Sequence, residues 1–370
     1  MSDEKPTIKA IIKKVSINGT EKEIDAPLHN TQYHTYIVVV GTQDYSSDTT
    51  RNLATPFKPI LDKIPITEGK SSVGKGSKLM FVHQGLRRLN LNRDIKYDFL
   101  LCSRGYTSKQ INAIKEAVEN TYKGKFVLVT SAKQIINYIN TADVNKSNGI
   151  SGERYNSTIK QLLFYSHGVV GEISLGLAPA GVDITEYSFE EKQVKQLREE
   201  AFTHNAHIYS FCCRTGLGNS KVDKSVYINP KESKTDPKNR YNLLSSESLA
   251  QKLANQTKST VFAYLCRSDY EDTLFTKDEL CFYDHYKAHE KGKTSIENKS
   301  CGDTYKHMLA PNYKLTEEEI KRKKEWNDII KNQNNNLDLA IFDPDGARHP
   351  VKGGTTPEGT PSDMKTFKPQ

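Results

Sequence analysis

Six short apolar runs, separated by amphipathic segments, constrain the fold of this chain more than any other feature. Each run is bounded by polar residues, which is the pattern of a strand covered on both faces of a sheet. The segments between the runs carry apolar residues at helical spacing, and Thr107 is a suitable N-cap for one of them. Strands that alternate with helices predict a three-layer α/β/α sandwich with a mainly parallel central sheet. The predicted strands are 35–41, 97–103, 126–130, 159–168, 207–213 and 259–266, and the predicted helices follow Thr107 and cover 131–140, 190–202 and 246–255.

The regions around this alternation divide the chain into four parts. Residues 1–34 are an N-terminal extension, 35–290 are the sandwich domain, 291–340 are a helical region, and 341–370 are a tail or extended arm rich in proline, glycine and threonine. Inside the sandwich domain, residues 217–245 are rich in lysine, asparagine, serine and proline, which predicts a long exposed loop.

The composition is that of a soluble globular protein. The chain of 370 residues is 36% hydrophobic, which is enough to bury a core, and it has no apolar run long enough to span a membrane. The N-terminal stretch MSDEKPTIKAII has charges and a proline where a signal peptide needs an apolar segment. Six cysteines without CxxC spacing indicate neither a zinc ribbon nor a disulfide framework. We therefore expect a cytoplasmic protein with reduced thiols, no catalytic metal and no membrane partner.

The net charge of +8 does not by itself indicate a nucleic-acid partner, because acidic residues are interleaved with the basic ones. The densest basic run, EEEIKRKKEW at 317–326, is typical of a solvated helix face. The stretch GKSSVGKG at 69–76 is close to the phosphate-binding GxxxxGK[ST] loop, but Gly76 replaces the hydroxyl residue and no apolar strand precedes it. We therefore predict no nucleic-acid partner and no nucleotide site.

Two of the predicted strands end in residues that suit nucleophilic catalysis. One ends in Ser166-His167-Gly168 and the next in Cys212-Cys213. If the strands are parallel neighbours, the imidazole can take the thiol proton and the thiolate can attack a carbonyl carbon. The N–H groups of Gly168 and Cys213 would then form an oxyanion hole. The structural alternative is a hydrogen-bonded strand-end histidine beside an inert core thiol.

These motifs resemble those of the caspase and metacaspase group of cysteine peptidases. SHGVVG at 166–171 is similar to the histidine motif of that group, and FCCRTG at 211–216 is similar to its cysteine motif, where the second cysteine is the nucleophile. The two motifs lie about 50 residues apart, as in caspases. AYLCRSDYEDTLFT at 263–276 is similar to a turn that borders the substrate pocket. The resemblance covers about residues 35–285 and implies a caspase-like fold, cysteine endopeptidase activity, a histidine base and Cys213 as nucleophile.

The resemblance leaves the P1 specificity open, because Phe211 stands where metacaspases carry an aspartate of the S1 pocket. The predicted substrate-binding residues are Ser166, Asp44 and Asp269, with Asp48 as a further acid, whereas a preference for aspartate would use Arg51, Arg214 and Arg267. We expect a basic P1 residue. The loop at 217–245 corresponds to the place where caspases are cut into two subunits, so we also expect self-cleavage there.

The expected partner is a protein or peptide substrate, with no required cofactor and with calcium left open as an activator. One alternative is a caspase-like docking module that has kept the dyad but lost its S1 pocket. Another is a bacterial toxin effector, exported by a signal-peptide-independent secretion machine that engages the arm at 341–370. The oligomeric state stays open.

Overall fold

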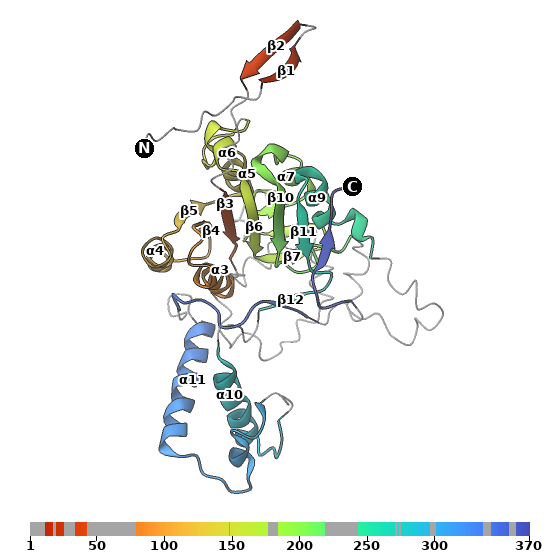
Figure 1. Ribbon diagram of the computed structural model, residues 1–370. Coiled ribbons are helices and arrows are strands. Elements are labelled where there is room, and N and C mark those ends of the chain that lie inside the picture. Colours follow the sequence, from red (N-terminus) through yellow and green to blue (C-terminus); the bar gives the residue numbers. More distant parts are fainter. Residues whose placement is uncertain are drawn as a thin grey trace, which may run out of the picture.

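The structure, a computed structural model, describes residues 12–17, 20–25, 34–42, 79–147, 149–176, 184–218, 243–270, 273, 275–296, 301–335, 342–354 and 360–370. Figure 1 shows an α/β domain built on one large sheet and, apart from it, a hairpin of the helices α10 (Lys277–Glu290) and α11 (Glu317–Asn335). The described residues contain no helix with the length and apolarity needed to cross a bilayer.

The large sheet has seven strands in the order β14-β11-β10-β6-β3-β4-β5. All neighbours pair in parallel except β14, which pairs antiparallel with β11. The strand order changes direction between β3 and β6, and in open α/β sheets such a switch point is where sites form, beyond the carboxyl ends of the strands. The strands are β3 (Thr35–Val40), β4 (Tyr97–Cys102), β5 (Lys125–Val129), β6 (Ile159–Tyr165), β10 (Phe202–Ser210), β11 (Thr260–Ala263) and β14 (Lys365–Phe367).

Both faces of the sheet are buried, which confirms the predicted mixed α/β architecture with a mainly parallel sheet. Ile37 and Val39 of β3 belong to one core cluster, whereas Val38 and Val40 belong to the other, because successive side chains point to opposite faces. The first cluster includes residues of α5 (Ala132–Thr141), α7 (Glu191–Val194) and α9 (Leu249–Thr257), and the second includes residues of α3 (Met80–Leu91) and α4 (Ser108–Glu116).

The helix boundaries follow local chemistry in one case and a tertiary contact in another. Thr107 is the N-cap of α4, as predicted, and forms a capping box with Gln110. The helix predicted over 190–202 is wrong, since α7 ends at Val194 and only a short 3-10 turn, Glu199–Ala201, follows. The side chain of Asn140 donates to the carbonyl of Gln196 at 2.9 Å and accepts the N–H of Arg198 at 3.0 Å, which stabilises the interruption.

The helical hairpin has its own small core, formed by Phe275, Phe282, Tyr286, Met308 and Trp326. Helix α10 shares this core with α11, and the core includes residues from Phe275 onward, on both sides of the predicted boundary at 290. The run at 317–326 lies in helix α11, as predicted. It was expected to form a solvated face, but Trp326 at the end of the run is buried.

A disulfide joins Cys281 of α10 to Cys301, with the two Cα atoms 5.2 Å apart. The expectation that all thiols are reduced is therefore wrong for this pair. The other four cysteines, Cys102, Cys212, Cys213 and Cys266, are free.

The C-terminal residues 342–354 and 360–370, here called the C-terminal strap, are part of the α/β domain. The strap starts at α3, where the N–H of Asp343 donates to Nε2 of His83 at 3.1 Å. It then supplies β13 (Lys352–Gly353), which pairs with β12 (Ser268–Asp269), and ends as the edge strand β14. The predicted arm thus completes the sheet.

The remaining strands form two small sheets. β7 (His167–Val169), β8 (Glu172–Ser174) and β9 (Ser188–Phe189) form an antiparallel sheet directly after β6. In the predicted N-terminal extension, β1 (Ile12–Ile17) pairs antiparallel with β2 (Thr20–Asp25).

Candidate active site

The two motifs at the strand ends are brought together by the register of β6 and β10. These strands are parallel neighbours, and Phe164 of β6 pairs with Ser210 of β10. His167 and Cys213 each lie three positions beyond this pair. Both residues therefore leave the sheet at the same edge and at the same height, next to the switch point.

Gly168 lies against the backbone of Cys213. A methyl group on its Cα would come within 2.5 Å of the carbonyl oxygen and 2.9 Å of the amide nitrogen of Cys213. Glycine is therefore required at position 168 by the close approach of two backbones. This approach also brings together the two residues whose N–H groups form the predicted oxyanion hole.

The two adjacent cysteines have different environments. Cys212 is fully buried, its thiol contacts the carbonyl of Phe164 at 3.8 Å, and burial raises its pKa to about 12. Cys213 is half-buried. Burial also raises the pKa values of Cys102 and Cys266. Cys213 is thus the one free thiol among the described residues that is not enclosed in the core.

Ser268 of β12 touches the Cys213 thiol, a contact that the sequence did not predict. The N–H of Ser268 donates to Sγ of Cys213 at 3.2 Å, and the Ser268 hydroxyl lies 3.2 Å from the same sulfur. The resemblance of residues 263–276 to a pocket-bordering turn gave the only sequence signal for this segment, and it pointed to the neighbouring Asp269.

His167 is held among aromatic rings. Its imidazole meets the ring of Phe81 edge-on with 4.9 Å between centroids, and Phe81 meets Tyr270 in the same way. Burial lowers the pKa of His167 to about 4, so the ring is neutral at pH 7 and can accept a proton. Phe81 lies at the start of α3, a helix that the sequence analysis did not identify.

Ser166 and Phe211 have structural surroundings. Ser166 is buried, and its hydroxyl donates to the carbonyl of Ser174, which joins the end of β6 to β8. The ring of Phe211 stacks on Tyr165 with 4.6 Å between centroids, and its carbonyl accepts a hydrogen bond from the Tyr270 hydroxyl at 2.9 Å. The contacts of both residues are therefore with the protein's own backbone and rings.

Arg214 follows the candidate nucleophile in the chain, and its charge interacts with Cys213 and with Arg267. Arg214 is buried and has a left-handed backbone (φ 57°), and its N–H donates to the carbonyl of Cys266 at 2.9 Å. Burial and, to a smaller extent, the positive charge of Arg267 lower the pKa of Arg214 to about 10. A left-handed backbone conformation is uncommon in residues other than glycine, and such residues are found more often at functional sites.

The predicted pocket acids are not assembled around Cys213 by the described residues. Asp269 is exposed at the end of β12, and the residue of that strand whose hydroxyl lies beside the Cys213 sulfur is its neighbour Ser268. Several residues named in the sequence analysis lie outside the described residues. They are Asp44, Asp48 and Arg51, the stretch at 69–76, and residues 219–242 of the predicted loop.

The described part of the chain contains no group of three or more His, Cys, Asp or Glu side chains placed to hold a metal ion. Comparison of the chain with protein-family models, with curated proteins and with solved structures gave no match. What the arrangement offers chemically is a neutral imidazole, an accessible thiol and two backbone amides at one sheet edge.

Proposed function

We propose that this chain is a caspase-like cysteine endopeptidase that uses His167 as base and Cys213 as nucleophile. The observation that carries the proposal is the β6–β10 register, which puts both residues three positions beyond a paired position of neighbouring parallel strands. The exclusion of Cys212 from solvent supports the assignment of Cys213.

In the proposed reaction, His167 takes the proton of the Cys213 thiol as Sγ attacks the carbonyl carbon of the scissile peptide bond. The oxyanion is held by the N–H groups of Gly168 and Cys213. His167 then gives its proton to the leaving amine as the C–N bond breaks and a thioester remains. Water, deprotonated by His167, hydrolyses the thioester and regenerates the thiol. The pKa of about 4 keeps His167 in the base form throughout the neutral range.

The charges around Cys213 bear on the P1 residue. A basic P1 side chain needs a carboxylate nearby, but Phe211 stands where the family that the chain resembles carries an aspartate. Arg214, whose charge interacts with Cys213 and with Arg267, instead places a buried cation next to the thiol. We therefore propose an acidic P1 residue in place of the basic residue expected from the sequence.

The disulfide between Cys281 and Cys301 favours the alternative of an exported effector over a cytoplasmic enzyme, since disulfides persist in oxidising compartments. The substrate would then be a protein or peptide that the enzyme meets after export.

A direct test is labelling of the purified protein with peptidyl acyloxymethyl ketones that carry aspartate or arginine at P1, followed by intact mass spectrometry. We expect one adduct with the aspartate reagent in the wild type and in Cys212→Ala, and none in Cys213→Ala or His167→Ala. A faster reaction with the arginine reagent would overturn the P1 proposal alone. No adduct with either reagent would favour the docking module.

A further inference from the structure

The side chain of Cys213 receives its hydrogen bonds from a single residue of the described structure. The Ser268 N–H donates to Sγ at 3.2 Å, the Ser268 hydroxyl is 3.2 Å from Sγ, and the thiol faces the Ser268 carbonyl at 3.7 Å. These distances are within the range of sulfur hydrogen bonds. A single residue thus presents two donors and an acceptor to the sulfur.

The contact suits both protonation states of the sulfur. In the thiol form, the S–H can donate to the carbonyl or hydroxyl oxygen of Ser268. In the thiolate form, the N–H and the O–H of Ser268 both donate to the anion, and hydrogen bonds to a charged acceptor are the stronger kind. In the resting site His167 is neutral and supplies no positive charge, so the hydrogen bonds from Ser268 and the nearby charge of Arg214 are what can stabilise a thiolate.

Ser268 is fixed in place from outside the site by the C-terminal strap. It pairs with Gly353 in the β12–β13 ladder, and the N–H of Gly354 donates to the carbonyl of Arg267 at 2.7 Å. Gly353 is itself enclosed, because a methyl group on its Cα would lie 1.8 Å from the carbonyl oxygen of Ser362. The strap therefore leaves β12 little freedom to move away from Cys213.

We infer that Ser268 is a catalytic residue that stabilises the Cys213 thiolate through its backbone N–H and its hydroxyl, with β13 of the C-terminal strap holding it in position. The inference rests on the proposed function, since it assigns a role at the same sulfur. It also gives the C-terminal strap a part in the chemistry, although the strap supplies no side chain to the dyad.

The test is the pH dependence of Cys213 alkylation by iodoacetamide, in which the thiolate carbon–sulfur bond forms and iodide leaves. The rate is followed by mass spectrometry of the Cys213 peptide, so it needs no peptidase activity. Ser268→Ala removes the hydroxyl donor and keeps the N–H. We expect alkylation of Cys213 at neutral pH to slow about tenfold, as for loss of one hydrogen bond to a charged group.

Two variants separate this effect from a structural one. Ser268→Thr keeps the hydroxyl and should restore the wild-type profile. Ser259→Ala removes a buried hydroxyl elsewhere in the domain, where it donates to the carbonyl of Thr257, and should leave the profile unchanged. If Ser268→Ala does not fold, Gly353→Ala perturbs the same contact from the strap and should slow Cys213 alkylation at neutral pH.

The outcomes distinguish the inference from the proposed function. A Ser268→Ala profile that coincides with the wild type, or a Ser268→Thr profile that matches Ser268→Ala, would overturn the inference even if the enzyme cleaves peptides. A shifted profile in a protein without peptidase activity would uphold the hydrogen bond and reject the proposed function. A Gly353→Ala protein with an unchanged profile would remove the role assigned to the strap.

Discussion

The α/β domain and the helical hairpin of this chain are stabilised in different ways. The sheet of the α/β domain buries two large apolar clusters, one on each face. The four described cysteines of this domain are free thiols. The hairpin has a core of five buried side chains, and it carries the disulfide between Cys281 and Cys301. A small core buries too little apolar surface to be stable alone, so small units need crosslinks or other supports.

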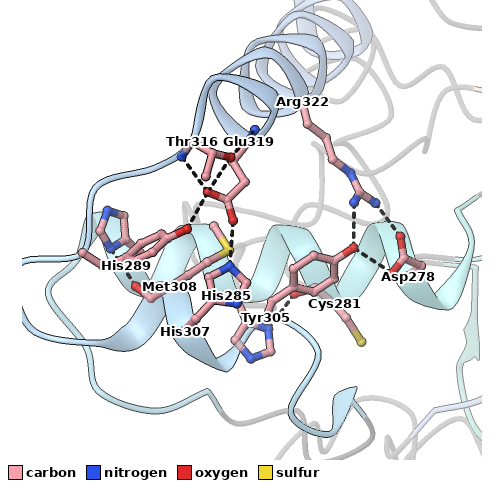
Figure 2. A network of polar contacts seen from close by, with 11 residues as sticks. Asp278, Cys281, His285, His289, Tyr305, His307, Met308, Thr316, Glu319 and Arg322 are labelled. Atoms are coloured by element: carbon pink, nitrogen blue, oxygen red, sulfur yellow. Dashed lines mark hydrogen bonds and ion pairs between the residues drawn. The ribbon is translucent and has the colours of Figure 1, made fainter.

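Polar contacts are the second support of the hairpin, as Figure 2 shows. The Arg322 guanidinium of α11 donates to Asp278 of α10 and to the Tyr305 hydroxyl, both at 2.7 Å, and Tyr305 donates to Asp278 at 2.7 Å. Glu319 of α11 accepts from Tyr313 at 3.0 Å and lies 2.8 Å from Nε2 of His307. These contacts join α10, α11 and the segment between them.

The two regions differ in function as well as in stabilisation. The candidate dyad, the oxyanion donors and Ser268 all lie in the α/β domain, whereas the hairpin adds no described residue to the site. Chemistry should therefore depend on the α/β domain, and redox conditions should act on the hairpin. Four predictions test this division.

The largest expected effect is on catalysis and comes from the α/β domain. His167→Ala should lower kcat/KM by about 10²–10⁴-fold, as for loss of a general base, and Cys213→Ala should abolish cleavage. Thermal unfolding of both variants should stay close to that of the wild type. His207→Ala, which changes a half-buried histidine of β10, is the matched control and should keep full activity. Unfolding of His167→Ala would instead support the structural alternative.

The disulfide gives the next effect. The double variant with Cys281→Ser and Cys301→Ser should lose about 2–4 kcal/mol of hairpin stability, because the crosslink restricts the unfolded chain. Hydrogen exchange in α10 and α11 should become faster, while exchange in β3 and β6 stays unchanged. A reductant should have this effect on the wild type and none on the double variant. Loss of peptidase activity in the double variant would show that the two regions are coupled.

The sequence was sufficient for those parts of the fold whose signal is local. The apolar runs identified β3, β4, β5, β6, β10 and β11, because a buried parallel strand is apolar on both faces. Helix α3 was missed although Phe81, Val82, Leu86 and Leu89 recur at helical spacing, so a readable pattern was overlooked. The end of α7 could not be predicted from the local sequence, because it depends on the side chain of Asn140 from another helix.

The site divides in the same way. His167, Gly168 and Cys213 could be proposed because each comes shortly after an apolar run that forms a strand, and neighbouring parallel strands share an edge. Ser268 could not, since its place next to Sγ depends on pairing with Gly353 far along the chain. The disulfide could not be paired from spacing alone, because it requires Cys281 and Cys301 to meet in the folded hairpin.

The response to acid should distinguish the two regions. Burial, with the charge of Arg348, lowers the pKa of His83 in α3 to about 3, and its Nε2 accepts the N–H of Asp343 in the strap. In the unfolded chain, the His83 imidazole binds a proton near pH 6.5. The contribution of neutral His83 to the stability of the folded domain is therefore complete above pH 6.5 and is lost as the pH falls toward 3. In the hairpin, hydrogen bonds from Arg322 and Tyr305 lower the pKa of Asp278, so its contribution is lost only below about pH 4.

We therefore expect the α/β domain to lose stability first as the pH falls from 7 to 5. His83→Gln keeps an acceptor for Asp343 and should remove on the order of 2 kcal/mol of this pH dependence. The exposed His204 provides the control, and His204→Gln should leave the dependence unchanged. The measurement is urea unfolding at a series of pH values. Earlier loss of α10 and α11 protection in hydrogen exchange would reverse the predicted order.

The smallest expected effect concerns the ion pair between Arg322 and Asp278. Asp278→Asn removes the charge but keeps an oxygen that can accept from Tyr305, and both side chains are partly exposed, at 29% for Arg322 and 59% for Asp278. Exposed ion pairs contribute roughly 0–1 kcal/mol, because water and salt screen the attraction. We therefore expect opening of α10, measured by hydrogen exchange, to become easier by less than about 1 kcal/mol. Asp303→Asn, which removes the more exposed pair with Lys306, should have no measurable effect. A larger loss for Asp278→Asn, with unchanged kcat/KM, would mean that the polar contacts of the hairpin are as important to its stability as the disulfide.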